Sequence, residues 1–359
     1  MSERRWRVGV WAAVMAVVGV MVLPAAALAS PVGSTTKAAD AAVHTHLLDA
    51  ISGWSKWPKA GTVRAWGSNV AGQLGDGTPV PGLTPVQVVG LDQVTAIAGG
   101  RNSGYALRRD GTVWAWGYNG SGQLGDGTTT DSTTPVQVVG LDQVTAIASG
   151  GFSGYALRED GTVSAWGSDQ FGQLGDGTPF GDCCNRTTPV QVVDLDQITA
   201  IASGFSSGYA LRRDGTVWAW GSDEFGQLGD GTPMTIRTTP VQATGLDQVT
   251  AIAGGSASGY ALRRDGTVWA WGANESGSLG DGTIVIRTTP VQVVGLDQVT
   301  AIAGGSASGY ALRRDGTVWA WGSNSFGQLG DGTTTDSTTP VQVVGLDQIT
   351  AIAGGGNSG

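Results

Sequence analysis

Hydrophobic and polar positions alternate along this chain in short runs that are separated by Gly, Asp or Pro. Within Thr317–Trp321, Trp319 and Trp321 fall on one side while Val318 and Ala320 fall on the other, because successive side chains of a β-strand point to opposite faces. Such a run has two apolar faces and predicts a strand packed on both sides. The strands expected in this stretch are Val299–Ala303, Tyr310–Arg313, Thr317–Trp321 and Pro340–Val344.

The same pattern recurs about every 50 residues. The string Gly-Thr-Val-x-Ala-Trp-Gly begins at Gly61, Gly111, Gly161, Gly215, Gly266 and Gly316. In most copies an Asp-Gly pair, such as Asp315-Gly316, separates the second run from the third, and this pair is a strong hairpin signal. Four strands in a period of this length predict an all-β propeller of four-stranded blades, since the coils of a β-solenoid usually repeat in fewer residues.

The composition agrees with a packed β-structure and disfavours long helices. Among 359 residues there are 60 Gly and 14 Trp, and only 14% of the residues are charged. Abundant Gly and β-branched residues favour turns and strands over helices. The net charge of −9 argues against a nucleic-acid partner, because phosphate binding needs clustered positive charge.

The N-terminus has the layout of a secretory signal peptide. Three arginines precede the apolar run Val8–Leu23, and Ala27-Leu28-Ala29 supplies the small residues of a cleavage site. An uncleaved anchor is the alternative, although the run is short for a membrane span. We expect a signal peptide over 1–29, an Ala/Thr/Ser-rich linker over 30–51 and a propeller over 52–359. The mature protein is then secreted or held at the cell surface, without an integral membrane span.

Six repeats are visible, and two interpretations of their ends stay open. The segment Ser52–Lys59 resembles the second strand of the other copies, and the chain stops at Gly359, just before that strand would begin again. The early segment could therefore close a six-bladed ring. Alternatively, the chain holds an incomplete seven-bladed ring.

Three motifs together resemble a known family. Gly-Thr-Val-Trp-Ala-Trp-Gly, then Gly-Gln-Leu-Gly-Asp-Gly-Thr, then Thr-Pro-Val-Gln-Val is similar to the repeat of the regulator of chromosome condensation family. The resemblance implies a β-propeller, typically of seven blades. The family includes a nuclear guanine-nucleotide exchange factor, the secreted bacterial β-lactamase inhibitor protein II and many exported bacterial proteins. In the family, nucleotide exchange relies on Asp and His residues. The propeller region of this chain lacks histidine, so the resemblance gives little support for an exchange role here.

Candidate chemistry is sparse. The recurring Asp of Gly-Asp-Gly-Thr could suggest calcium, but Asp and Gly form tight turns by themselves, and the alternating acids of a calcium loop are absent from the sequence. The only cysteines, Cys183 and Cys184, are adjacent and could form a strained disulfide or pair between chains. Outside them, the propeller region offers no His or Cys for a zinc site or a catalytic pair. We expect no enzyme activity, no cofactor and no metal.

One rim of the predicted propeller is the candidate interface. In an antiparallel blade, the loop between the first and second strands and the loop between the third and fourth strands emerge on the same side. These loops vary among the copies, whereas the opposite loops hardly change. An invariant repeat with one variable rim is typical of a scaffold that presents recognition loops, although drift in unconstrained loops would look similar.

The variable rim is rich in acidic side chains and carries apolar ones. Thirteen acids lie in these loops against Arg101, Arg186, Arg237 and Arg287. We therefore expect a protein partner with a basic contact face, bound by a monomeric propeller. The alternatives are a secreted enzyme inhibitor similar to the β-lactamase inhibitor and, less favoured, a nucleotide exchange factor. The candidate partner-binding residues are Arg101, Phe152, Phe171, Phe205, Glu224, Phe225, Glu275 and Phe326.

Overall fold

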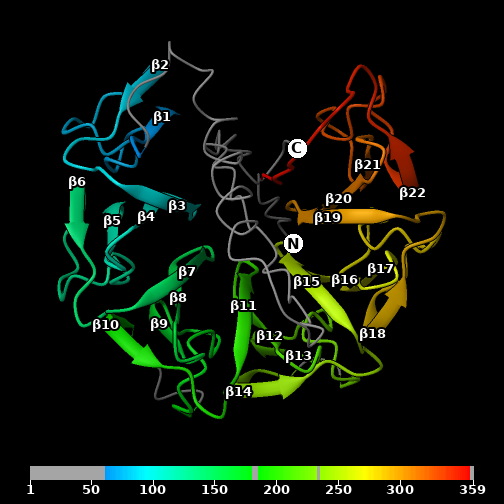
Figure 1. Ribbon diagram of the computed structural model, residues 1–359, viewed down its shortest axis with the longest axis horizontal. Helices are drawn as coiled ribbons and strands as arrows, with labels where there is room; N and C mark the ends of the chain where they lie inside the picture. The colour runs from blue at the N-terminus through cyan, green and yellow to red at the C-terminus, as the bar shows by residue number, and fades with distance from the viewer. Residues whose placement is uncertain (1–60, 180–184, 233–234, 356–359) are drawn as a thin grey trace, which may run out of the picture.

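The computed structural model describes residues 61–179, 185–232 and 235–355. It confirms the all-β prediction, with 22 strands in six antiparallel sheets. In Figure 1 these sheets follow one another around a common axis in chain order, with an interval between the first sheet and the last. The fold is therefore a β-propeller in which each sheet is built from strands that follow one another in the sequence.

Five sheets have four strands and the first has two. The first three sheets comprise β1 (Arg64–Gly67) and β2 (Gly82–Gln87); β3 (Val94–Gly99), β4 (Ser103–Arg108), β5 (Val113–Gly117) and β6 (Ser132–Gln137); and β7 (Val144–Ser149), β8 (Ser153–Arg158), β9 (Val163–Gly167) and β10 (Arg186–Gln191). The other three comprise β11 (Ile198–Ser203), β12 (Ser207–Arg212), β13 (Val217–Gly221) and β14 (Arg237–Gln242); β15 (Val249–Gly254), β16 (Ser258–Arg263), β17 (Val268–Gly272) and β18 (Arg287–Gln292); and β19 (Val299–Gly304), β20 (Ser308–Arg313), β21 (Val318–Gly322) and β22 (Ser337–Gln342).

The strands expected in the last repeat agree with the structure to within two residues, except for the outermost one. Whereas Pro340–Val344 was the expectation, β22 covers Ser337–Gln342. Its pairing with β21 runs from Trp319 opposite Gln342 to Gly322 opposite Ser337 with a shift of register between them. The Pro lies inside this strand, which is possible because β22 has a neighbour on only one side.

Aromatic side chains form the seams between neighbouring sheets. The Trp220 ring of β13 is fully buried and meets the Tyr155 ring of β8 edge-on, with 6.1 Å between ring centroids. Both side chains donate to the same backbone carbonyl, that of Gln173, through the indole Nε1–H at 2.9 Å and the phenol O–H at 2.8 Å. The same Tyr–Trp contact recurs at three other seams. Five core clusters of the described residues thus each join two neighbouring sheets.

Small residues allow this packing. A Cβ added to Gly154 would lie 2.4 Å from the ring of Trp166, a distance that no real side chain tolerates. The Gly of Ser-Gly-Tyr-Ala-Leu is therefore required because a tryptophan lies flat against it. The Trp of Ala-Trp-Gly is buried in five copies, whereas Trp66 on β1 is 47% exposed.

The expectations for the chain ends fall on residues outside the described ranges. They concern the signal peptide over 1–29, the linker over 30–51 and the closing segment over 52–59, and all three stay predictions. Among the residues that the structure describes, no helix is long and apolar enough to cross a membrane.

Candidate functional site

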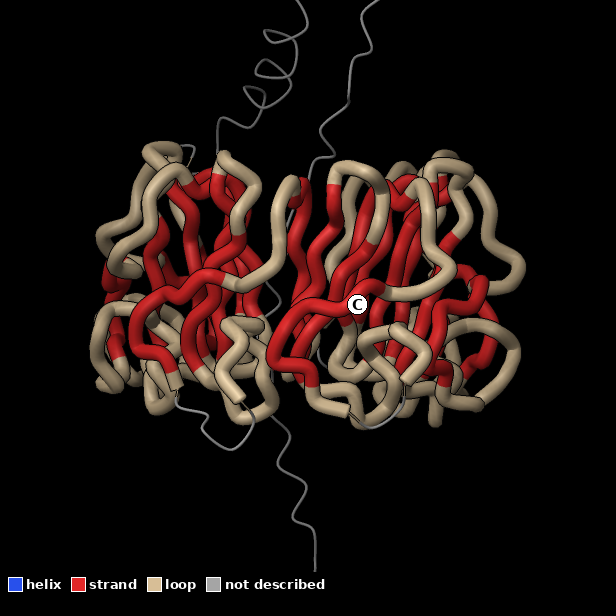
Figure 2. Tube along the Cα trace, turned by 90° about the horizontal axis from the view of Figure 1, so that it is seen from below, coloured by secondary structure: helices blue, strands red, loops and turns tan. Residues whose placement is uncertain are grey.

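The two kinds of variable loop lie side by side on one rim, as the topology requires. The backbone N–H of Tyr118, after β5, donates to the carbonyl of Asn102, between β3 and β4, at 2.8 Å. The equivalent bond recurs in the four following sheets, for example from Ser222 to Ser206 at 2.9 Å. Figure 2 shows the loops gathered at two opposite sides of the layer of strands. We call the side with the loops after the first and third strands of each sheet the variable rim.

The inner loops of the variable rim are linked to one another. The N–H of Arg101 donates to the carbonyl of Gly151, that of Gly151 to Phe205, and that of Phe205 to Ser256, at 3.0–3.2 Å. Glycines make room for this approach: a Cβ on Gly204 would lie 2.7 Å from the Gly255 carbonyl. Residues some 50 positions apart in the sequence therefore become neighbours.

Four of these neighbours form what we call the anchor cluster: Arg101, Tyr118, Phe152 and Phe205. The guanidinium of Arg101 lies 5.6 Å from the ring centroid of Phe152 and 5.9 Å from that of Phe205. Phe152 also meets Tyr118 and Phe205 edge-on, at 6.0 and 5.9 Å. Arg101 is exposed and the three rings are half-buried. Cation–π and edge-to-face contacts of this kind hold an amphipathic surface in place.

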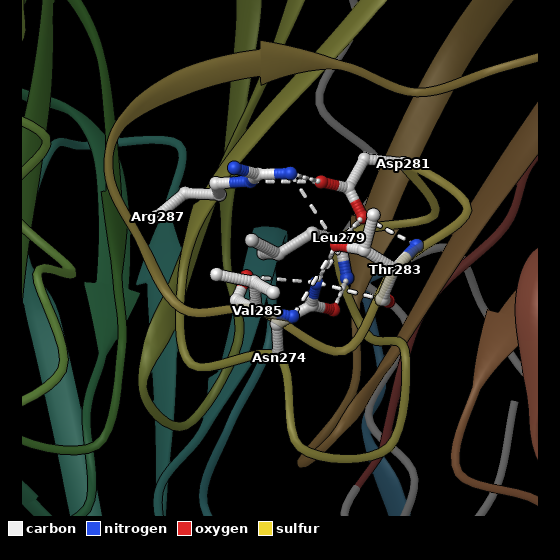
Figure 3. Close-up of polar contacts among 6 residues, drawn as sticks. All are labelled: Asn274, Leu279, Asp281, Thr283, Val285 and Arg287. Carbon is white, nitrogen blue, oxygen red and sulfur yellow. Dashed lines mark hydrogen bonds and ion pairs between the residues drawn. The ribbon is translucent and has the colours of Figure 1, made fainter.

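The outer loops of the variable rim are held by a buried side chain that we call the latch residue. In the loop between β17 and β18 it is Asn274, shown in Figure 3. Its Oδ1 accepts from the N–H of Leu279 at 2.9 Å, and its Nδ2 donates to Asp281 Oδ1 at 3.2 Å and to the carbonyls of Thr283 and Val285 at 3.1 Å. One amide thus fastens the whole loop.

The recurring Asp of Gly-Asp-Gly-Thr serves this loop. The Oδ1 of Asp281 accepts from the N–H and Oγ1–H of Thr283, and its Oδ2 pairs with Arg287 at 2.7 Å. Burial alone would raise the pKa of Asp281, but hydrogen bonds from Thr283 and Arg287 hold it below its ordinary value. Across 61–179, 185–232 and 235–355, no group of three or more His, Cys, Asp or Glu is placed to hold a metal ion.

The structure brings together some of the candidate residues and separates the others. Arg101, Phe152 and Phe205 meet in the anchor cluster. The others are spread over four successive outer loops: Phe171, Glu224, Phe225, Glu275 and Phe326. Of the phenylalanines, Phe326 is 70% exposed and Phe171 is 40% exposed.

The sequence analysis missed two features of the rim. Tyr118 stands where the other copies have Ser or Ala. A large aromatic side chain at a position of small residues could therefore have indicated a candidate binding residue. The second feature is the exposed run of Ile284, Val285 and Ile286 in one outer loop. The cysteines at 183 and 184 lie outside the described residues.

Part of the rim's charge is neutralised within the loops. Three of its arginines pair with aspartates of their own loops: Arg186 with Asp176, Arg237 with Asp230, and Arg287 with Asp281. Glu224 and Glu275 remain exposed.

Comparison with known proteins identifies the repeat. Residues 57–359 match the RCC1-like domain family. The human E3 ubiquitin-protein ligase HERC2 is 38% identical over 88 residues, which are 24% of this chain but 2% of that protein. The human probable E3 ubiquitin-protein ligase HERC6 is 32% identical over 96 residues, 26% of this chain and 9% of that protein. The chain therefore spans only a small part of the curated relatives that it matches.

Solved structures agree on the architecture. Human WBSCR16 superposes with a TM-score of 0.73 at 25% identity, covering 82% of this chain and 79% of its own. Yeast RCC1 (Prp20), solved with Kap60, superposes with a TM-score of 0.71 at 24% identity, covering 82% of this chain and 75% of its own. Together with the match over residues 57–359, these findings show that the chain belongs to the RCC1-like domain family.

Proposed function

We propose that this chain is a non-enzymatic scaffold that binds a protein partner on its variable rim, with the anchor cluster as the centre of the contact. The observation that carries the proposal is that the fold does not need the cluster. At the positions of Phe205 and Phe152, other copies have Ser256 and Ala257 or Ser306 and Ala307, and those sheets form the same strands and loops. Side chains that packing does not require, gathered on one partly exposed patch, are the kind that binding selects.

The side chains of the anchor cluster favour a protein as the partner. Arginine and aromatic residues are the side chains that most often carry binding energy at protein interfaces. The exposed Glu224 and Glu275 on neighbouring loops favour a partner with a basic contact face, whose association would slow as salt screens the charges. Among the relatives, yeast Prp20 was solved bound to the protein Kap60, which supports a protein as the kind of partner.

A pair of rim variants tests the proposal. Phe152→Ala with Phe205→Ser converts the anchor cluster into residues that other copies already carry, so the melting temperature should stay the same. Phe326→Ala removes a more exposed ring outside the cluster and serves as the matched control. Proteins from the producer's surroundings are captured on the wild type, and the dissociation constant of the purified partner is then measured for each variant.

The cluster variant should weaken binding by about 30-fold, which corresponds to ~2 kcal/mol, and should do so mainly through faster dissociation. The control should bind within about twofold of the wild type. If the cluster variant binds as tightly as the wild type, the anchor cluster is not the contact.

We further propose that the mature protein acts outside the cytoplasmic membrane. Support comes from the arginines, the apolar run and the Ala27-Leu28-Ala29 site of the N-terminus. An exported location disfavours a role in nucleotide exchange, because small GTPases and their nucleotides are found inside cells.

A further inference from the structure

The latch residue is an amide in four repeats and a carboxylic acid in two. It is Asn69, Asn119, Asn274 and Asn324 in four outer loops, but Asp169 and Asp223 in the loops after β9 and β13. All six side chains are almost completely buried, and Asp223 has no exposed surface. The two kinds of side chain have nearly the same shape, yet the second arm of Asn donates hydrogen bonds and that of an ionised Asp cannot.

One carboxylate oxygen of each acid accepts the same backbone hydrogen bond as the amide oxygen of Asn in the other repeats. The Oδ1 of Asp223 accepts from the N–H of Leu228 at 2.9 Å, and that of Asp169 accepts from the N–H of Leu174 at 3.0 Å. These bonds match the one between Leu279 and Asn274. The acids are therefore seated in the latch position, and the difference lies in the other oxygen.

The second arm of Asp223 is buried without a hydrogen-bond partner. Where Asn274 directs an N–H at an aspartate and two carbonyls, an ionised Asp223 presents only an oxygen, and its neighbour Asp230 is also a hydrogen-bond acceptor. Arg237 does not donate to this oxygen, since its Nη2 donates to Asp230 and Thr232 and its buried Nε has no hydrogen-bond partner. A buried, unpaired carboxylate oxygen is costly, and a proton on it removes the cost.

We propose that Asp169 and Asp223 are protonated latches, which fasten their outer loops while they hold a proton and loosen them when they lose it. The proton on the second oxygen takes the place of the amide N–H of the other repeats. In both loops, ionisation places a negative charge near a second carboxylate, Asp176 or Asp230, and in Asp223 it leaves the second oxygen unpaired. The loops concerned are adjacent on the variable rim and carry Phe171 and Phe225.

The charged surroundings agree with this assignment. Burial is the largest cause that raises the pKa of Asp223 to about 7 and that of Asp169 to about 6. The neighbouring Asp230 and Asp176 raise these values further, whereas Arg237 and Arg186 lower them in part. Facing each latch from the second strand of its sheet is a buried tyrosine, Tyr209 or Tyr155, whose pKa burial raises far above neutrality. From the next sheet, the loop of Asp223 meets the backbone of Arg287 and Thr288 at Gly226, and the Arg287 guanidinium is held by Asp281.

The direction in which stability changes with pH follows from the linkage between proton binding and folding. The folded chain holds these protons more tightly than the unfolded chain, in which an Asp titrates near pH 3.9. The latches therefore contribute their full stability below the unfolded pKa, and that stability is lost as the pH rises through about 6 to 7. Carboxylates whose pKa is lowered by ion pairs or hydrogen bonds in the folded state behave in the opposite way.

The repeats supply the variants for the test. Asp169→Asn with Asp223→Asn installs the amide of the other four copies, and Asn274→Asp installs a new acid as the reverse variant. Melting temperatures are measured from about pH 5 to about pH 8.5 in a metal-free buffer, and again with Ca²⁺ or Na⁺ added. Infrared difference spectroscopy of the folded protein follows the protonated carboxyl band over the same range.

We expect the double variant to melt about 5 °C above the wild type at the alkaline end, and the gap to narrow steadily as the pH falls to about 5. Asn274→Asp should make the melting temperature fall more steeply with rising pH than it does in the wild type. The wild type should show a carboxyl band that titrates near neutrality and that the double variant loses. Parallel melting profiles for wild type and double variant, or an absent band, would overturn the proposal. So would stabilisation of the wild type, but not of the double variant, by an added cation, because the latch would then hold a metal ion and not a proton.

Discussion

The seam between sheets gives a prediction whose size follows from the structure. Trp220 is fully buried, donates to the Gln173 carbonyl and packs edge-on against Tyr155. Trp220→Phe removes the N–H and part of the ring while keeping an aromatic side chain in place. Trp66, the same residue of the first repeat, is 47% exposed, so Trp66→Phe is a matched control within one protein.

The expected loss has two parts. The hydrogen bond contributes about 1 kcal/mol net, and not more, because the Gln173 carbonyl still accepts from Tyr155 after the substitution. The missing ring atoms correspond to two or three buried methylenes at about 0.8 kcal/mol each, or ~2 kcal/mol. We therefore expect Trp220→Phe to lower the free energy of unfolding by about 2–3 kcal/mol, and Trp66→Phe to lower it by less than about 1 kcal/mol.

Urea unfolding of both variants checks these values. Far-ultraviolet circular dichroism is the suitable signal, since each substitution removes a tryptophan fluorophore. The slope of the transition should stay that of the wild type, because the area exposed on unfolding hardly changes. Equal losses at Trp220 and Trp66 would refute the seam as the source of stability between sheets.

Two further predictions concern the close packing at the seam and the N-terminus. Gly154→Ala drives a methyl group into the Trp166 ring and should lower the free energy of unfolding by about 1–3 kcal/mol, measured by thermal unfolding. The control Ser206→Ala, at a loop position that is already Ala in two copies, should change the stability little. A Gly154→Ala protein as stable as the wild type would show that the Trp166 ring can move to make room for the methyl group. Protein recovered from producing cells should begin at Ser30 and lie outside the cytoplasmic membrane, and Edman sequencing that returns Met1 from a cytosolic fraction would contradict export.

The sequence by itself determined the class of fold and the rim. Periodicity near 50 residues, two-residue alternation and Asp-Gly turns are local properties, so they predicted the four-stranded repeat before any contact was known. The same antiparallel order also predicted which loops share a side. Even the misplaced outer strand, shifted at Ser337–Gln342, was wrong only in where it starts and ends.

Only the tertiary structure decided which residues meet across repeats. Arg101, Phe152 and Phe205 belong to three successive repeats, and nothing in a local pattern says that their loops converge while Phe171 and Phe225 stay apart. The latch residue likewise shows its meaning only when it is buried, because in sequence an Asp in place of Asn is an ordinary loop variation. Hydrogen-bond complementarity and desolvation depend on what surrounds a side chain in space, and the order of residues along the chain does not contain that information.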